Sequence, residues 1–278
     1  MKVNLAESAG FCFGVQRALN IALRQAESEN NIFMLGDVVH NENVIKQIRK
    51  AGIKKIRRLA PGRGKTLLIR AHGASLATLK KVKNLGYNII DATCPMVKEI
   101  HRIAQDAENK GFTVIIIGDK KHDEVQGIAG QLKKKAIIID KINKIHVSAV
   151  KKIKKAAVVV QSTQNIEKVL RILKQLKNYV PKLKFYNTIC QPTRIKQEEI
   201  KCLPLENDAM VIIGSKKSAN TRRLYEISKS LNKRTFWVNS NKELRPGYFK
   251  GLESVGVTAG ASTPKESIRK ITEYLSNL

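Results

Sequence analysis

Short apolar runs alternate with longer amphipathic stretches along most of the chain. The runs are five to seven residues long and rich in Val, Ile and Leu, which predicts buried strands. The stretches between most of them repeat apolar residues at helical spacing. Because the two patterns alternate, we expect an α/β fold with mostly parallel sheets. The predicted strands are 65–71, 87–91, 113–118, 136–140, 156–162, 209–214, 234–239 and 254–260, and the predicted helices are 14–29, 96–111, 166–178, 220–232 and 264–278.

Polar and reactive side chains follow the predicted strands repeatedly. Ligands of open parallel sheets bind beyond the carboxyl ends of the strands, so these positions are candidates for a site. The recurrence of a strand followed by a cysteine or a histidine indicates several similar α/β lobes that face one centre. The residues at these strand ends are His72, Cys94, His122, Glu124, Ser162, Thr163, Ser218, Asn220 and Ser262.

The segment DATCPMV at 91–97 places Cys94 where a strand gives way to a helix. Pro95 suits the first helical position, where the missing N–H has no partner to lose. The partial positive charge at a helix N-terminus stabilises a thiolate. Cys94 is therefore a candidate nucleophile or metal ligand.

Two further cysteines stand in similar surroundings. Cys12 in AGFCFGVQRAL and Cys190 in NTICQPTRIKQ each precede a helical pattern, whereas Cys202 in IKCLPLEND does not and is interpreted as an ordinary thiol. A single cysteine is most often a small buried residue, but three in one context favour ligand duty. Three thiolates can hold zinc together with a fourth ligand, or an iron–sulfur cluster with one iron left open. The spacing leaves both alternatives open.

Composition narrows the class of protein. The chain has 278 residues, 42% of them hydrophobic, which predicts a globular protein and not a disordered one. The four cysteines are far apart, unlike a secreted disulfide framework. No apolar run approaches the roughly 20 residues of a membrane span, and no leader sequence opens the chain. We therefore expect a cytoplasmic protein with no membrane partner.

The formal net charge is +29, which raises the question of nucleic-acid binding. Lysines are spread over the whole chain, with short runs at 133–135 and 151–155. Aromatic residues make up only 5%, so platforms for base stacking are scarce. We do not expect a dedicated nucleic-acid function. A basic surface also suits an acidic protein partner or an anionic substrate.

Nine segments occur in order between residues 9 and 264: AGFCFGVQRAL, LGDVVHNENVI, IRAHGAS, DATCPMV, HDEVQGIAG, VVVQSTQ, NTICQPT, GSKKSANTRRL and VGVTAGASTP. Together they make the chain closely resemble the LytB/IspH family of 4-hydroxy-3-methylbut-2-enyl diphosphate reductases. The resemblance implies three α/β lobes around a central cluster and substrate cavity. We expect the lobes at 13–95, 96–186 and 187–278, with 1–12 joining the third, as one catalytic unit.

The resemblance also implies the chemistry. Members of the family carry one [4Fe–4S] cluster on three cysteines, which correspond to Cys12, Cys94 and Cys190, and one iron has no protein ligand. They remove the substrate hydroxyl with two electrons and two protons, giving isopentenyl and dimethylallyl diphosphate in the last step of the non-mevalonate (MEP) isoprenoid pathway. Their electron donor is a ferredoxin or a flavodoxin, which is usually acidic. The basic composition fits such a donor.

Other positions carry over from the family one at a time. Glu124 corresponds to the proton donor, and Ser162 takes the place of a threonine that relays the proton. The family's histidines that contact substrate correspond to His40, His72 and His122. Its diphosphate contacts in the third lobe correspond to Ser218, Ala219, Asn220 and Ser262.

Besides Ser162, three positions depart from the commoner family pattern. Ala219 replaces a second serine, which removes a hydroxyl and leaves a backbone N–H. Pro192 and Lys196 replace the commoner Ala and Arg near Cys190. We expect these changes to affect substrate affinity, and not the cluster ligands or Glu124.

Two other classes of function compete with the reductase. One is a basic RNA-associated protein that keeps the fold without activity. The other is a zinc hydrolase that uses the same thiolates. The combination of Glu124 with the three cysteines favours the reductase over the first, and metal content separates it from the second.

Overall fold

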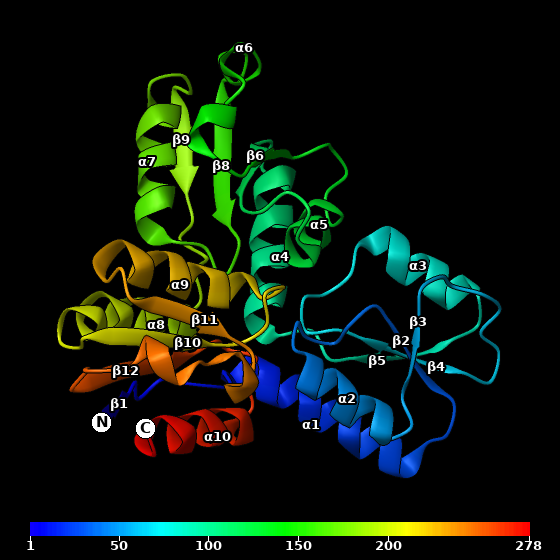
Figure 1. Ribbon diagram of the computed structural model, residues 1–278. Helices are drawn as coiled ribbons and strands as arrows, with labels where there is room; N and C mark the ends of the chain where they lie inside the picture. The colour runs from blue at the N-terminus through cyan, green and yellow to red at the C-terminus, as the bar shows by residue number, and fades with distance from the viewer. The chain divides into compact units, whose positions relative to one another are not determined.

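The computed structural model describes all 278 residues, which form two compact units (Figure 1). The terminal unit comprises Met1–Gln16, Val39–Gln47 and Gln191–Leu278. The central unit comprises Arg17–Val38 and Ile48–Cys190. Helices α1 (Phe13–Ser28) and α2 (Glu42–Lys50) have residues in both units. No helix combines the length and the apolar character that a membrane crossing requires.

The terminal unit is built on one parallel sheet in the order β1-β12-β10-β11. Alternate residues of its strand AMVII point to opposite faces. Val211 and Ile213 pack with helix α10, whereas Met210 and Ile212 pack with helices α8 and α9. Helices therefore cover both faces. The elements are β1 Lys2–Leu5, α8 Gln191–Cys202, β10 Ala209–Ile213, α9 Ala219–Leu231, β11 Thr235–Val238, β12 Ser254–Ala259 and α10 Lys265–Ser276.

The central unit contains two parallel sheets. The first has the order β3-β2-β4-β5, and its strand β4 is buried along its whole length. Leu67 and Ile69 of this strand pack with Val82 of helix α3. A strand buried on both faces is continuously apolar, as TLLI is. The elements are β2 Ile32–Leu35, β3 Lys54–Ile56, β4 Thr66–Ile69, α3 Leu76–Asn84 and β5 Asn88–Asp91.

The second sheet of the central unit has the order β7-β6-β8-β9. Ile115 and Ile117 of its strand β6 pack with α7, while Val114 and Ile116 pack with α4 and α5. Helices therefore cover both faces of this sheet as well. The elements are α4 Pro95–Asn109, β6 Thr113–Ile117, α5 Asp123–Ala129, β7 Ile137–Ile139, α6 Val147–Val150, β8 Lys155–Val160, α7 Ile166–Lys177 and β9 Lys182–Phe185.

Four short 3₁₀ helices complete the chain. The terminal unit holds three of them, and the central unit holds one, between β7 and α6. Their bounds are η1 Ile142–Lys144, η2 Leu203–Leu205, η3 Asn241–Glu243 and η4 Pro246–Tyr248.

The fold class predicted from the sequence is confirmed, because all three sheets are parallel and flanked by helices. All eight predicted strands are present. Four strands were not predicted, and three of these, β1, β3 and β9, lie at the edges of their sheets. In β3 and β9 exposed lysines interrupt the apolar pattern, as is common at sheet edges. The sheets lie within the three predicted lobe ranges, whose limits stay a prediction.

Candidate active site

Glu124 is buried in the first turn of α5, with 2% of its surface exposed. Both of its carboxylate oxygens contact Ser162. This serine follows strand β8, which pairs with β6, the strand before α5. The Ser162 hydroxyl donates to Oε2 at 2.8 Å, and the Ser162 N–H donates to Oε1 at 2.6 Å. Next to it, His122 caps α5, and its Nδ1 accepts the Glu124 N–H at 3.2 Å. The structure thus brings together three residues predicted from strand ends.

Burial raises the pKa of Glu124, because it disfavours the charged carboxylate. The two hydrogen bonds from Ser162 favour the charged form and lower the pKa, but burial outweighs them. A carboxyl group with a raised pKa keeps its proton at higher pH than an exposed glutamate and can donate it in a reaction. Glu124 is therefore suited to be a general acid, with the Ser162 hydroxyl as the neighbouring relay.

Two replacements of Ser162 distinguish the contribution of its hydroxyl group from the effect of side-chain size. We expect Ser162→Ala to lower turnover of the diphosphate substrate by about 10- to 100-fold, because it removes one charge-assisted hydrogen bond to Glu124. Ser162→Thr keeps the hydroxyl and is expected to stay within about threefold of the parent protein. Steady-state kinetics of both variants measure this. Equal losses in the two variants would mean that crowding, and not the hydroxyl, decides turnover.

Two histidines of the central unit lie side by side. His72 follows β4 of the first sheet, and His122 follows β6 of the second. Their ring centroids are 5.2 Å apart and the rings are nearly perpendicular, at 86°. Imidazole N–H groups are donors for phosphate oxygens. The pair is therefore a candidate anion contact next to Glu124.

The backbone N–H groups of two cysteines donate hydrogen bonds to the segments that carry His72 and Ser162. The Cys94 N–H donates to the carbonyl of Ala71, the neighbour of His72, at 3.0 Å. The Cys190 N–H donates to the carbonyl of Ser162, also at 3.0 Å. Cys94 directly precedes α4 with Pro95 as its first residue, and Cys190 directly precedes α8, so both stand at helix starts as predicted.

Cys12 lies in the terminal unit, directly before α1. Its N–H donates to the carbonyl of Ala261 at 3.1 Å. The next residue, Ser262, donates its hydroxyl to the carbonyl of His40 at 3.3 Å. One loop after β12 therefore contacts two of the segments that carry predicted site residues.

The start of α9 holds the other predicted contacts of the terminal unit. Ser218 caps the helix by accepting the Thr221 N–H at 3.3 Å. Asn220 is only 4% exposed, and neither its amide nitrogen nor its amide oxygen has a hydrogen-bond partner. Buried polar groups are normally paired, so this amide is placed to meet a ligand. Ala219 offers a backbone N–H at the same helix end, where anions are favoured.

The two residues near Cys190 that differ from the commoner family pattern both fit the structure around them. Pro192 is the second residue of α8, within the first turn, where backbone N–H groups have no intrahelical acceptor. Lys196 is 2% exposed and its ammonium donates to the carbonyls of Ser8 and Ala259. A buried cation needs such acceptors. Lys196 thus holds α8 against the loop that precedes Cys12 and the strand that precedes Ser262.

Arg17 was not identified from the sequence. Its guanidinium donates to the carbonyl of Thr93 at 3.1 Å and so fixes the loop directly before Cys94. The available signal was a basic residue in the segment FGVQRAL that follows Cys12. By contrast Cys202 ends α8 and is exposed, which agrees with its interpretation as an ordinary thiol.

The model of the family described as "LytB protein" matches residues 3–276. The chain belongs to the LytB family. LytB proteins are iron–sulfur enzymes, and an iron–sulfur cluster requires free cysteine thiols as ligands. None of the four cysteines forms a disulfide bond, and Cys12, Cys94 and Cys190 each stand directly before a helix. These three thiols fit the ligand set of a cluster.

Relatives within the LytB family agree over the full length. A protein of Geobacter sulfurreducens named 4-hydroxy-3-methylbut-2-enyl diphosphate reductase is 37% identical and covers 99% of this chain and 97% of its own. One of Aquifex aeolicus with the same name is 36% identical, covering 99% and 96%. These relatives favour the reductase over the RNA-associated alternative.

Solved structures of the family share the fold. One described as (E)-4-hydroxy-3-methyl-but-2-enyl diphosphate reductase, the terminal enzyme of the non-mevalonate pathway, has 36% identity, a TM-score of 0.73 and full coverage of both chains. That of the Plasmodium falciparum E-1-hydroxy-2-methyl-but-2-enyl-4-diphosphate reductase has 26% identity and a TM-score of 0.91. It covers 99% of this chain and 88% of its own.

Proposed function

We propose that this LytB protein is a 4-hydroxy-3-methylbut-2-enyl diphosphate reductase of the non-mevalonate pathway. The reaction breaks the bond between the allylic carbon and the hydroxyl oxygen. Two electrons and two protons enter, the oxygen leaves as water, and isopentenyl or dimethylallyl diphosphate remains. The observation that carries the proposal is the buried Glu124, with its raised pKa, bonded to Ser162 next to the backbone of Cys190.

Cys12, Cys94 and Cys190 would hold a [4Fe–4S] cluster in which one iron has no protein ligand. When bound, the cluster supplies the electrons and a Lewis-acidic iron for the hydroxyl group. A helix starts directly after each of the three cysteines, and backbone N–H groups there carry partial positive charge that suits an anionic group. Arg17 supports this arrangement by fixing the carbonyl directly before Cys94.

Each unit carries donors that match the family's diphosphate contacts. In the terminal unit these are Ser218, the N–H of Ala219, the Asn220 amide, Ser262 and His40. In the central unit they are His72 and His122. Hydroxyl, amide and imidazole donors at helix starts and strand ends suit a phosphate group. The unpartnered amide of Asn220 supports this assignment most directly.

Glu124 would be the proton donor. The Ser162 hydroxyl would relay this proton to the leaving hydroxyl or to the allylic carbon. The Ser162 hydroxyl can accept a proton from one side and donate from the other. Glu124 itself is 2% exposed, so little water reaches this carboxyl group. The raised pKa lets Glu124 keep its proton at higher pH than an exposed glutamate does.

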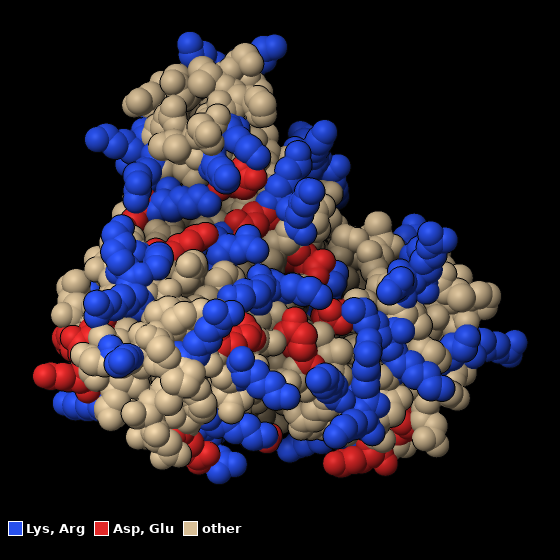
Figure 2. All heavy atoms as spheres, in the orientation of Figure 1, with Lys and Arg blue, Asp and Glu red and all other residues tan.

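The electron donor would be an acidic protein, a ferredoxin or a flavodoxin. Residues 133–190 contain fifteen Lys and Arg against two acidic residues, whereas residues 96–132 contain five against six. Figure 2 shows Lys and Arg side chains over the region where Figure 1 places α6 and α7. A surface on which basic residues are concentrated attracts an acidic partner before the two proteins come into contact.

Salt tests this attraction. Raising the ionic strength from about 0.05 to 0.5 M should slow electron delivery from an acidic ferredoxin by about tenfold, because the charges are screened. Turnover with a small-molecule reductant is the control and should change much less. A donor-dependent rate that does not respond to salt would contradict electrostatic docking.

The first test of the function is made on anaerobically purified protein. We expect about four irons and about four acid-labile sulfides per chain, together with conversion of the diphosphate substrate to the two isoprenoid products. The metals, the visible spectrum and the products are measured on one preparation. Zinc in place of iron, or no turnover by protein with a full cluster, would contradict the proposal.

A further inference from the structure

The central unit carries predicted site residues on segments of two different sheets. One segment leaves β4 and contains His72, and the other begins α5 and contains His122 and Glu124. The reaction proposed above needs these groups at fixed separations. The contacts between the two segments therefore decide whether the site is correctly assembled.

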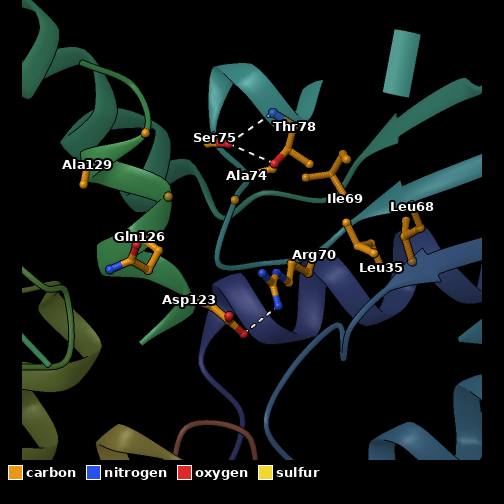
Figure 3. Close-up of a pocket in the computed structure, with 13 residues that line it drawn as sticks. Leu35, Leu68, Ile69, Arg70, Ala74, Ser75, Thr78, Asp123, Gln126 and Ala129 are labelled. Atoms are coloured by element: carbon orange, nitrogen blue, oxygen red, sulfur yellow. Dashed lines mark hydrogen bonds and ion pairs between the residues drawn. The ribbon is translucent and has the colours of Figure 1, made fainter. Parts of the chain in front are cut away.

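An ion pair joins the two segments at the end nearest the site. Arg70 directly follows β4, and Asp123 is the first residue of α5. The Arg70 Nη1 lies 2.5 Å from the Asp123 Oδ2, with the two side chains 24% and 32% exposed. Figure 3 shows the guanidinium pointing toward Asp123 at the start of the helix. Arg70 lies two residues before His72, and Asp123 lies between His122 and Glu124.

The other end of α5 is fixed by close packing and backbone contacts. The Leu76 N–H donates to the Gly130 carbonyl at 3.0 Å, and the Gln131 amide donates to the Ala74 carbonyl at 2.7 Å. A Cβ at Gly130 would lie 2.2 Å from the Ser75 Cβ, so the backbones meet there with no spare space. The C-terminal end of α5 is thus held without any help from Arg70.

The beginning of α5 is held to the second sheet, because Glu124 accepts two hydrogen bonds from Ser162 and Val125 is buried. A pocket of about 440 Å³ separates it from the first sheet and is lined by Leu35, Ala74, Thr78, Asp123 and Gln126, among others (Figure 3). The pocket runs along α5 as far as Gly130. The Arg70–Asp123 ion pair crosses that space. Gly36 makes room for it, since a Cβ there would lie 2.9 Å from Arg70 Nη1.

We propose that Arg70 and Asp123 are positioning residues that set the distance from His72 to His122 and Glu124. The proposal rests on the proposed function. Neither residue is asked to touch substrate. Loss of either charge removes this link between the segment that carries His72 and the start of α5, which stays bound to Ser162 through Glu124. Small displacements of catalytic groups are costly, since about 1 Å can lower a rate by about 100-fold.

The test uses the holoenzyme with Arg70→Ala, Asp123→Ala, the double variant and Arg70→Lys. We expect each single alanine variant to lose about 10- to 100-fold in kcat with iron content and urea midpoint unchanged. The double variant should lose no more than the worse single one, because the two residues act as one unit. Arg70→Lys keeps the charge and should regain most of the rate. Arg102→Ala, which removes an exposed ion-pair residue on α4, is the matched control and should leave kcat unchanged.

Hydrogen–deuterium exchange of the segment 119–127 supplies a readout that does not depend on turnover. Exchange there should become about tenfold faster in Arg70→Ala and Asp123→Ala, but not in Arg102→Ala. Single variants that keep kcat within twofold, or additive losses in the double variant, would overturn the proposal. If the parent protein does not reduce the substrate, the proposed function fails, and unchanged exchange at α5 still decides against the positioning role.

Discussion

Glu124→Gln is expected to lower turnover by about 10²- to 10⁴-fold, the usual contribution of a general acid. Glutamine has the size of the glutamate side chain and can keep both contacts to Ser162. Its carbonyl oxygen accepts the Ser162 N–H, and its amide donates to the Ser162 hydroxyl after that hydroxyl rotates. It has no proton to give. Product formation under saturating reductant measures the loss.

The pH dependence provides the control for this variant. In the parent protein kcat should fall as pH rises through the raised pKa of Glu124, because the carboxyl group loses the proton that it donates. In Glu124→Gln this fall should disappear from the residual rate. Turnover within about threefold of the parent, with the same pH profile, would remove Glu124 from the mechanism.

Folding stability should respond to the same group. Between the ordinary glutamate pKa and the raised pKa of Glu124, the folded protein binds a proton that the unfolded chain releases. The free energy of unfolding therefore decreases as pH rises through this window and levels off above it. Glu124→Gln removes the ionisable group and should flatten this part of the curve. Urea unfolding at a series of pH values records the difference.

Cys94→Ser is expected to abolish turnover together with the iron. A serine hydroxyl is a poor ligand for a cluster iron, since the ligand set of such clusters is thiolate. Iron and sulfide should fall together from about four per chain to a small fraction of that number. Folding should survive, because the backbone N–H that bonds to Ala71 does not change. Metal analysis, the visible spectrum and far-ultraviolet circular dichroism measure these points.

Cys202→Ser is the matched control for that experiment. Cys202 is exposed at the end of α8, directly before the short 3₁₀ helix η2, and is the one cysteine without a proposed ligand role. The control should keep its iron and its turnover. Equal iron in Cys94→Ser and Cys202→Ser would contradict the assignment of Cys94 as a ligand.

The sequence predicts buried elements better than peripheral ones. Strands such as β6 and β10 are continuously apolar because helices cover both faces, so their pattern is unmistakable. The edge strands β3, with two lysines before its isoleucine, and β9, which alternates lysine with apolar residues, resemble loops when only apolar runs are counted. The short helices α3 and α5 were missed for a similar reason, because seven to nine residues give too few turns for a clear periodicity.

In the candidate site, the sequence predicts which residues lie at strand ends, but not which of them contact one another. Cys94, His122 and Glu124 follow strands, so their approximate position comes from the fold class alone. The contact of Ser162 with Glu124 joins residues 38 positions apart and needs the pairing of β6 with β8. The ion pair of Arg70 with Asp123 joins two sheets and was visible only as two charges beside family motifs.

The lysines of β3 and β9 have a consequence for the behaviour of the protein at high concentration. An open sheet edge can bind a strand from another molecule, and repetition of that step builds fibrils. Lys54 and Lys55 on one edge, and Lys182 and Lys184 on another, would bring like charges together in any such addition. These two edges therefore resist self-association, and a chain with this many cations stays dispersed where a neutral relative would precipitate.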